Sequence, residues 1–354
     1  MKNPKILFIQ PLIPHYRAPF FDRLSGRFNI FVRYGRADSG FETVERKYLK
    51  RVKNIKFGKA EFFFVFSELI KIKPDIVVTY GEVKQLSNII LLLIRKIFCF
   101  KLIIWSHGFK DKEMTLIDKF RLMEMHFSDG VIFYTEDCYK DAAKYNLNKT
   151  SYLNNTLELK KTEMISSVDE KDIIKKNFNI KTELNGLFIS RFTQVKAPEL
   201  LLEIMKRIHE KNNNIGFIII GQGDCKPDFS DYDFIYDFGR IYENNKKAVL
   251  LSLADFALMP RWIGLSVIES FAYKLPMFTL SNKMKNIEHS VEYFYLKHNV
   301  NCYIANDTNE LVLKIANIDK TELTNLGNNA YNLVNEELTM DNMVNNFCSF
   351  IEML

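Results

Sequence analysis

The chain has 354 residues and a formal net charge of +6 at pH 7, with 47% hydrophobic and 26% charged residues. This length predicts two domains, and the composition is that of a globular protein. Five scattered cysteines without a C-x-x-C pair suit a reducing cytosol and argue against a disulfide framework or a zinc site. They are Cys99, Cys138, Cys225, Cys302 and Cys348. The first 17 residues have too short an apolar run for a signal peptide.

Charge is unevenly distributed along the chain. Residues 1–155 contain 27 Lys and Arg against 16 Asp and Glu, a balance of +11, so the remaining residues have a balance of −5. A basic N-terminal half predicts an anionic partner or surface for that half. No fold signature of a nucleic-acid-binding protein accompanies the charge, so nucleic acid is not the expected partner.

Strands alternate with helices throughout the first half of the chain. The strands are expected at 5–10, 29–34, 76–79, 102–105 and 130–134, and the helices at 20–24, 87–100 and 115–126. This alternation predicts a parallel doubly wound sheet. The helix at 87–100 is strongly apolar but too short to span a bilayer, so it is interpreted as buried or interfacial.

The same pattern restarts after a polar stretch at 156–183, where we place the domain boundary. Strands are expected at 187–190, 216–221, 234–238, 255–259 and 276–280, with helices at 198–211 and 243–253. Two helices follow residue 307, and residues 340–354 form a terminal amphipathic segment. The expected domains are 1–158 and 159–337, with a C-terminal helix at 338–354.

The segment from Ala254 to Ala272 contains the clearest site signal. A short buried strand leads through a turn with Pro260 and Gly264 into an apolar helix. Backbone N–H groups and the helix dipole converge at such a turn, which therefore suits an anion. Glu269 is an acid on this apolar helix, and the hydroxyls of a sugar would satisfy it. The alternative is a Glu at the exposed edge of the helix.

Five other residues are candidates, each with a simpler explanation. Arg191 and Lys196 lie five residues apart in a strand-to-helix loop, where they could hold adjacent phosphates or could be ordinary solvated cations. Gly221 and Gly223 after a strand could approach a ligand or form only a tight turn. His107 closes a strand, where ligands often bind, but a lone histidine is more often structural.

These motifs together resemble retaining glycosyltransferases of the GT-B fold, family 4. The resemblance rests on Ser190-Arg191-Phe192-(x3)-Lys196, Gly221-Gln222-Gly223, and Pro260 to Pro276 with Gly264-Leu265 and Glu269. Trp105-Ser106-His107-Gly108 and Asn154-Asn155-Thr156 are also similar to the family. Pro14-His15-Tyr16-Arg17-(x)-Pro19-Phe20 looks like the subset that builds bacterial surface polysaccharides.

The resemblance implies two Rossmann-like domains that face each other across a cleft, with a C-terminal helix that crosses back to the first domain. The first domain would bind the acceptor and the second the nucleotide-sugar, linked to UDP or GDP. Arg191 and Lys196 would stabilise the leaving diphosphate without a metal or another cofactor. Gly264 and Leu265 amides would cap the phosphates, Glu269 would bind the ribose, and His107 would help to position the donor sugar.

Two positions depart from the family pattern. The family usually has a second Glu eight residues before Glu269, and here Arg261 stands at that position. Because the usual Glu contacts the donor sugar, we expect Arg261 to affect which sugar is bound. Ser190 replaces a usual Gly before Arg191 and slightly crowds the approach of the phosphates.

Three functions remain open on the sequence. The first is glycosyl transfer to a polysaccharide or lipid-linked glycan acceptor, with His15, Tyr16 and Arg17 contacting the acceptor. The second is a GT-B sugar epimerase, which would need paired carboxylates that the sequence does not show. The third is a catalytically impaired nucleotide-sugar-binding or scaffold subunit, suggested by Arg261. A dinucleotide oxidoreductase is disfavoured because no G-x-G-x-x-G follows the first strand.

The basic run from Arg46 to Lys59, the aromatic cluster Phe62–Phe66 and the apolar helix 89–98 all lie in the basic half. We expect these segments to attach the protein peripherally to the anionic cytoplasmic face of the inner membrane. The alternative is a solvated loop above an ordinary core helix.

Overall fold

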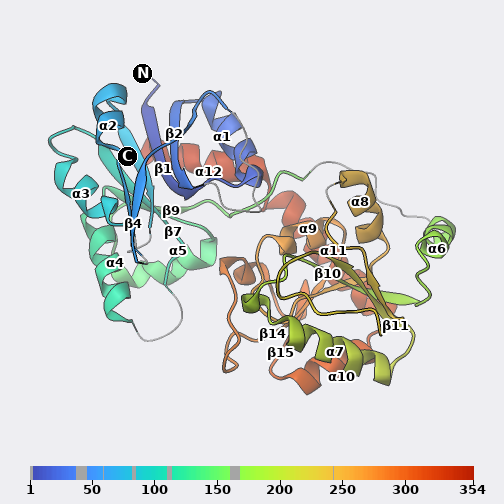
Figure 1. Cartoon of the computed structure of the whole chain (residues 1–354). Helices are drawn as coiled ribbons and strands as arrows, with labels where there is room; N and C mark the ends of the chain where they lie inside the picture. The colour runs from blue at the N-terminus through green and yellow to red at the C-terminus, as the bar shows by residue number, and fades with distance from the viewer. Residues whose placement is uncertain are drawn as a thin grey trace. The chain divides into compact units, whose positions relative to one another are not determined.

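The computed structural model describes residues 3–36, 46–58, 60–81, 85–109, 114–159, 168–241 and 243–354. Two compact units are present. Unit 1 comprises residues 1–158 together with 339–354, and unit 2 comprises residues 159–338. Both are drawn in Figure 1.

Unit 1 is built around a seven-stranded parallel sheet with the order β3-β2-β1-β6-β7-β8-β9. Its strands are β1 (Lys5–Leu12), β2 (Asn29–Arg36), β3 (Leu49–Arg51), β6 (Ile76–Tyr80), β7 (Lys101–Ser106), β8 (Gly130–Phe133) and β9 (Thr150–Tyr152). A separate antiparallel hairpin pairs β4 (Asn54–Phe57) with β5 (Ala60–Phe63). The central strands are apolar along their length because helices cover both faces of a parallel sheet.

The helices of unit 1 come from both ends of the chain. They are η1 (His15–Arg17), α1 (Ala18–Ser25), α2 (Phe66–Ile72), α3 (Ser87–Ile94), α4 (Leu116–Phe127), α5 (Glu136–Ala142), η2 (Ala143–Tyr145) and α12 (Met340–Met353). Thr115 and Asp118 form a capping box that begins α4.

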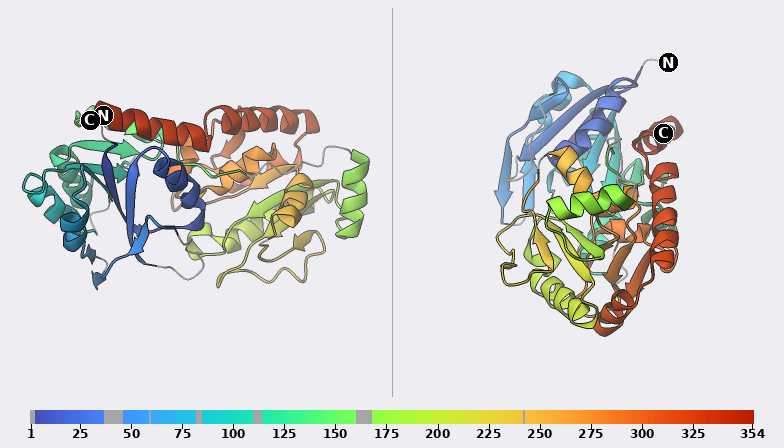
Figure 2. Two further views of the ribbon diagram at one scale, coloured as in Figure 1. Left: turned by 90° about the horizontal axis from the view of Figure 1, so that it is seen from above. Right: turned by 90° about the vertical axis from the view of Figure 1, so that its right-hand side faces the viewer.

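Helix α12 completes the core of unit 1, and both chain termini lie in that unit (Figure 2). The Phe347 ring lies 5.5 Å from Phe8 and 5.8 Å from Phe20, measured between ring centroids. Gly130 leaves room for the helix, since a Cβ there would come 2.7 Å from the Phe350 ring. The predicted return of the C-terminal helix to the first domain is therefore confirmed.

Unit 2 has a six-stranded parallel sheet with the order β12-β11-β10-β13-β14-β15. Its strands are β10 (Leu184–Ile189), β11 (Ile215–Ile220), β12 (Ile235–Asp237), β13 (Phe256–Leu258), β14 (Met277–Leu280) and β15 (Cys302–Ala305). Its helices are α6 (Val168–Asn177), η3 (Gln194–Lys196), α7 (Pro198–Lys211), α8 (Asn244–Ser252), α9 (Ser266–Ala272), η4 (Val291–Tyr295), α10 (Thr308–Ala316) and α11 (Lys320–Glu336).

The predicted fold of two Rossmann-like units is confirmed, and the differences are local. The polar run from 46 to 59 was expected to be a basic stretch without strands, but its described part contains β3 and β4. β15 was not expected either. The apolar helix is shorter than predicted, since α3 ends at Ile94 and the chain continues through turns to Phe100.

Candidate functional site

The carboxyl edge of the unit 2 sheet collects most of the predicted donor residues. β10 and β13 are neighbours at its centre, and the chain leaves them toward opposite sides of the sheet order. Ligands of doubly wound sheets bind at such a switch point. The loop after β10 contains Arg191 and Lys196, and the turn after β13 contains Arg261, Gly264 and Leu265. The structure therefore brings these two motifs to one edge.

Lys196 is a buried cation at this edge, with 9% of the residue exposed. Its Nζ donates to the Trp262 carbonyl oxygen and lies 3.8 Å from the Met259 sulfur. Burial lowers the pKa of Lys196 to about 8, while the Glu292 carboxylate acts in the opposite direction. Among the described residues, the ammonium thus forms hydrogen bonds only to neutral atoms, and it would be stabilised by a bound anion.

Hydrogen bonds to the segment that follows β14 hold the turn after β13 in place. The Trp262 N–H donates to the Glu288 carbonyl at 2.9 Å, and Trp262 has a left-handed φ of 56°. His289 accepts from the Ile263 N–H at 3.3 Å through Nδ1, so its Nε2 is the nitrogen that donates to the Leu280 carbonyl at 2.8 Å. This pattern requires a neutral ring.

Burial is also what lowers the pKa of His289 to about 4, with smaller contributions from the charges of Lys196 and Arg261. His289 therefore acts as a neutral support for the turn at pH 7. Sequence reasoning missed it, because it lies nine residues beyond β14 and no spacing rule marks it.

Gly264 and Leu265 present an open backbone at the start of α9. A Cβ added to Gly264 would meet no heavy atom within 4 Å. Among the residues that the structure describes, neither the Gly264 nor the Leu265 N–H donates a hydrogen bond. Room and unused donors coincide at this point, as an anion site requires.

Arg191 and Arg261 differ in their surroundings. Arg191 is exposed directly after β10. Arg261 is half-buried, and its Nε is enclosed without a hydrogen-bond acceptor among the described residues. Together with Lys196, they make this edge of unit 2 electropositive.

The Glu269 carboxylate forms an ion pair within unit 2. Its carboxylate pairs with the Lys247 Nζ of α8 at 2.5 Å, and about a fifth of the Glu269 side chain is exposed (19%). Lys247 was not singled out by sequence reasoning, since α8 showed no motif. The role of Glu269 toward a ribose stays a prediction, and any ligand there would share the carboxylate with Lys247.

Gly221 and Gly223 have a packing role. A Cβ on Gly221 would lie 2.0 Å from the Ser190 carbonyl oxygen, and one on Gly223 would lie 2.0 Å from that of Phe192. The Phe192 N–H in turn donates to the Gln222 carbonyl at 3.0 Å. The two glycines thus let the loops after β10 and β11 touch, and their donor-binding role stays a prediction.

An open hollow of about 570 Å³ lies beside Gly223 at the edge of the sheet. Lys226 stands in it and bridges the Gly221 carbonyl at 3.1 Å and the Asp237 carboxylate at 2.7 Å. The remaining lining is mostly polar and comes from Gln222, Pro227, Asp228, Phe229, Ser230, Tyr232 and Ile235. The hollow has the size of a small ligand.

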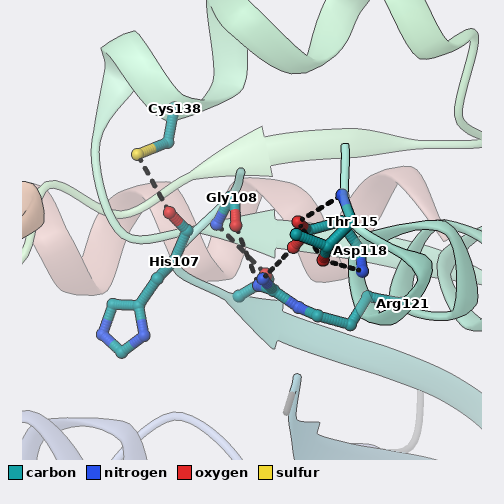
Figure 3. Close-up of polar contacts among 7 residues, drawn as sticks. His107, Gly108, Thr115, Asp118, Arg121 and Cys138 are labelled. Atoms are coloured by element: carbon teal, nitrogen blue, oxygen red, sulfur yellow. Dashed lines mark hydrogen bonds and ion pairs between the residues drawn. The ribbon is translucent and has the colours of Figure 1, made fainter. Parts of the chain in front are cut away.

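In unit 1, His107 follows β7, and Figure 3 shows its carbonyl oxygen next to the Cys138 thiol. Its ring stacks on Tyr134 with centroids 3.9 Å apart, and its Nδ1 lies 3.1 Å from the Tyr80 hydroxyl. Its carbonyl oxygen accepts from the Cys138 thiol at 3.3 Å. Burial lowers the pKa of His107 to about 4, assisted by the charges of Arg121 and Arg17.

Arg121 fixes the loop that contains His107. Its Nη2 donates to the Gly108 carbonyl at 2.8 Å and to the Ser106 hydroxyl at 3.2 Å. Asp118 lies 3.4 Å from its Nη1. The His107 ring points away from this group (Figure 3). Arg121 was not predicted, because its position on α4 shows no motif.

The predicted acceptor residues lie in η1, after β1. Arg17 is buried, and its Nη2 donates to the Asn155 side chain at 2.6 Å. Its guanidinium also lies 5.1 Å from the Trp105 ring centroid. Asp22, on the helix that follows, pairs with Arg46 and not with Arg17. His15 and Tyr16 pack edge to face in the same short helix.

No three His, Cys, Asp or Glu side chains in the described part of the chain gather closely enough to hold a metal ion. None of the described helices is both long and apolar enough to cross a bilayer.

Comparisons with known proteins point to unit 2 in particular. Residues 183–318 match the family "Glycosyl transferases group 1". The matched segment includes the loop with Arg191 and Lys196 and the whole turn before α9. An uncharacterized glycosyltransferase of Methanocaldococcus jannaschii is 27% identical over 237 residues, which is 60% of this chain and 56% of that protein. The chain thus spans little more than half of that relative.

Solved structures of similar fold extend over nearly the whole chain. Anabaena HepE in complex with UDP has a TM-score of 0.69 at 13% identity, covering 99% of this chain and all of HepE. WaaG, a glycosyltransferase involved in lipopolysaccharide biosynthesis, has a TM-score of 0.62 at 12% identity, covering 96% of this chain and 98% of WaaG. These likenesses show that the two units together form a GT-B-type fold.

Proposed function

We propose that the protein is a glycosyltransferase that moves a sugar from a UDP- or GDP-linked donor to a polysaccharide or lipid-linked glycan, with retention of configuration. The observation that supports this most directly is the electropositive, open turn at the switch point of unit 2. It lies inside the segment that matches group 1 glycosyl transferases. The complexes of HepE with UDP and with UDP-glucose favour a UDP-linked donor.

The chemistry proposed for this turn is stabilisation of the leaving diphosphate. As the bond from the sugar to the diphosphate breaks, negative charge grows on the phosphate oxygens. Arg191 and Lys196 supply positive charge there, and the Gly264 and Leu265 amides supply hydrogen-bond donors. Fixed donors in a partly buried site are worth more than the same groups in water. The mechanism proposed here needs no metal or other cofactor.

The other predicted site residues would orient the donor and the acceptor. Glu269 accepts hydrogen bonds from the ribose hydroxyls, with Lys247 holding the carboxylate in place. Arg261 offers donors to the sugar. In unit 1, a neutral His107 donates or accepts one hydrogen bond toward the sugar through its side chain or its carbonyl. His15, Tyr16 and Arg17 belong to the acceptor side.

We further propose that the protein belongs to family 4 and builds a bacterial surface polysaccharide such as lipopolysaccharide or capsule. It would work peripherally at the cytoplasmic face of the inner membrane, where lipid-linked acceptors are found. The likeness to WaaG supports this proposal only at the level of the fold.

A second candidate is a nucleotide-sugar-binding subunit without transferase activity. Arg261 favours it, because a cation stands where the family pattern has a sugar-contacting carboxylate. The ion pair of Glu269 with Lys247 favours it as well, since the carboxylate is already occupied.

The test is release of UDP or GDP from a panel of nucleotide-sugars by purified full-length protein, with and without a glycan acceptor. We expect release that persists in EDTA, and a product whose anomeric proton shows retention by NMR. Binding without release would favour the second candidate. A requirement for Mg²⁺ would contradict the metal-free mechanism.

A further inference from the structure

The exposed large apolar side chains are concentrated on one part of unit 1. Most of those in the described residues lie between 55 and 127, and they come from β4–β5, α2, α3 and α4. The others are scattered singly over the chain, at Ile173, Val195, Val300, Leu313 and Met353. Scattered apolar residues are ordinary on a soluble surface, but a contiguous group marks an interaction site.

Each helix of this region presents an apolar stripe outward. On α3 and the turn after it, Leu93 is 73% and Ile97 is 77% exposed, four residues apart. On α4, Leu116 is 84% exposed and the neighbouring Ile117 is also exposed. Residues three, four and seven apart share a helix face, so Met123 extends the stripe of Leu116. On α2, the stripe consists of Phe66 and Ile70.

Contacts between the elements join these stripes. The Phe66 ring lies 5.3 Å from that of Phe98. A small apolar hollow of about 60 Å³ separates Phe62–Phe66 from the α3 residues Ile90, Leu91 and Ile94. The Arg95 guanidinium binds the Phe127 carbonyl oxygen at the end of α4. Figure 1 shows α2, α3 and α4 along one side of unit 1. We name this surface the α2–α4 face.

Exposed lysines outnumber exposed acids around the α2–α4 face, where Asp75 is an exposed acid beside Lys73. Exposed lysines on or beside its elements are Lys53, Lys56, Lys71, Lys73, Lys96 and Lys119. Lys53 lies over the Phe64 ring at 5.7 Å, and Lys119 shares the helix face of Leu116. None of these lysines pairs with a carboxylate among the described residues.

The acidic side chains of the same elements are either paired with other residues or buried. Glu68 binds Arg33 and Lys50, each at 2.6 Å. Asp118 caps α4 and faces Arg121. Glu61 and Glu124 are buried. The surface therefore offers apolar groups with a surplus of cations.

We propose that the α2–α4 face docks on an anionic lipid bilayer. Its apolar side chains would enter the interface between headgroups and acyl chains, and its lysines would contact anionic headgroups. A second copy of the chain fits less well, since two faces with the same positive charge would repel each other. The proposal deepens the membrane location proposed above but does not depend on glycosyl transfer.

Flotation of the full-length protein with vesicles tests the proposal. We expect binding to phosphatidylcholine vesicles that contain phosphatidylglycerol, weakened by high salt, and little binding to phosphatidylcholine alone. The double variant Leu93→Ser/Ile97→Ser should bind at least about tenfold more weakly, because two buried aliphatic side chains are lost. The double variant Leu116→Ser/Ile117→Ser should weaken vesicle binding to a similar extent. The matched control Ile173→Ser/Leu313→Ser, at exposed positions of unit 2, should bind like the wild type.

The cationic part is tested by replacing Lys53, Lys96 and Lys119 with Gln. Each replacement should weaken binding to the anionic vesicles about fivefold. The same number of exposed lysines in unit 2, Lys211, Lys246 and Lys285, provides the control. Donor hydrolysis in solution, measured for every variant, should be unchanged, so failure of docking and failure of the proposed transferase function are distinguished.

Cys99 gives a second readout, because it is exposed two residues from Ile97. An environment-sensitive dye on Cys99 in a Cys225→Ser background should shift to the blue with anionic vesicles. Equal binding to neutral and anionic vesicles, or full binding by both serine pairs, would overturn the proposal. So would a wild-type dimer that Leu93→Ser/Ile97→Ser dissociates while vesicles are not bound, since the face would then join two copies.

Discussion

The two units use the same strand order around their first strand, but the loops at the carboxyl edges of their sheets differ. In unit 1, the loops after β1 and β7 are filled by the chain's own side chains. Arg17 is bound by Asn155 under the Trp105 ring, and His107 stacks on Tyr134. In unit 2, the loops after β10 and β13 leave an open glycine and two amides without an acceptor among the described residues, beside the buried cation Lys196.

This difference teaches that topology supplies a crevice but side chains decide whether it accepts a ligand. Both edges are electropositive, and each contains a partly buried neutral histidine. In unit 1, the Arg17 guanidinium has a strong neutral acceptor in Asn155 and aromatic rings around it, so its charge is stabilised internally. In unit 2, burial disfavours the charged form of Lys196 and the Glu292 carboxylate offsets this only in part, so a bound anion would stabilise the ammonium further.

The largest expected effect is on catalysis in unit 2. Replacing Arg191 or Lys196 with Ala should lower the transfer rate about 30- to 1,000-fold, equal to roughly 2–4 kcal/mol, by analogy with a lost oxyanion donor. Lys196→Arg should rescue only in part, since the planar fork needs different room. Steady-state kinetics would measure both, with Lys211→Ala as the control. An unchanged rate in both alanine variants would exclude these residues from the mechanism.

Two glycines of unit 2 test its packing and its ligand binding separately. Gly221→Ala should destabilise the fold by about 3 kcal/mol, because its Cβ would overlap the Ser190 carbonyl oxygen. Gly264→Ala should leave the free energy of unfolding within about 0.5 kcal/mol and weaken nucleotide binding instead. Denaturant titration and calorimetry measure the two quantities. If Gly264→Ala instead lowered the free energy of unfolding and left nucleotide affinity unchanged, Gly264 would be structural and no ligand would approach it.

In unit 1, the contacts of Arg17 at the carboxyl edge of the sheet lead to a prediction about stability. Arg17→Ala should cost about 2–3 kcal/mol of unfolding free energy, because it removes a buried charged hydrogen bond and ring contacts. Arg191→Ala, at an exposed position, should cost less than about 0.5 kcal/mol. If Arg17→Ala were as stable as the wild type, the contacts of Arg17 with Asn155 and the Trp105 ring would not stabilise the fold. The proposed acceptor role of Arg17 is measured separately, as the KM for the acceptor.

The smallest effect is on pH dependence. An unfolded histidine binds its proton near pH 6.5, whereas His107 and His289 do so near pH 4 in the folded state. The unfolded chain therefore binds more protons between these values, and stability should be full above pH 6.5 and fall toward pH 4. His107→Gln and His289→Gln should each flatten this fall. Parallel pH profiles for wild type and both variants would contradict the assignment.

Much of the fold could be predicted from the sequence, because apolar strands and amphipathic helices alternate with a clear period. β3, β4 and β15 could not, since they are short and only partly buried. The motifs predicted that Arg191 and Lys196 follow one strand and that Gly264 and Leu265 follow another, and the structure has them after β10 and β13. They could not reveal that Lys247 pairs with Glu269 or that His289 supports the turn, because both contacts join residues distant in sequence. Gly221 and Gly223 look like ligand glycines in sequence, yet the close backbone approach that requires them is visible only in three dimensions.

The central claim is that Lys196 and the open turn of unit 2 bind a nucleotide diphosphate. Calorimetry with UDP and GDP between pH 7 and pH 9 tests it most directly. Since the Lys196 pKa is about 8 in the free protein, affinity should fall about tenfold over this range as the ammonium loses its proton. Lys196→Met should bind more weakly and show no such fall. Binding of the preferred nucleotide by Lys196→Met with wild-type affinity, or no binding of either nucleotide by the wild type, would contradict the claim.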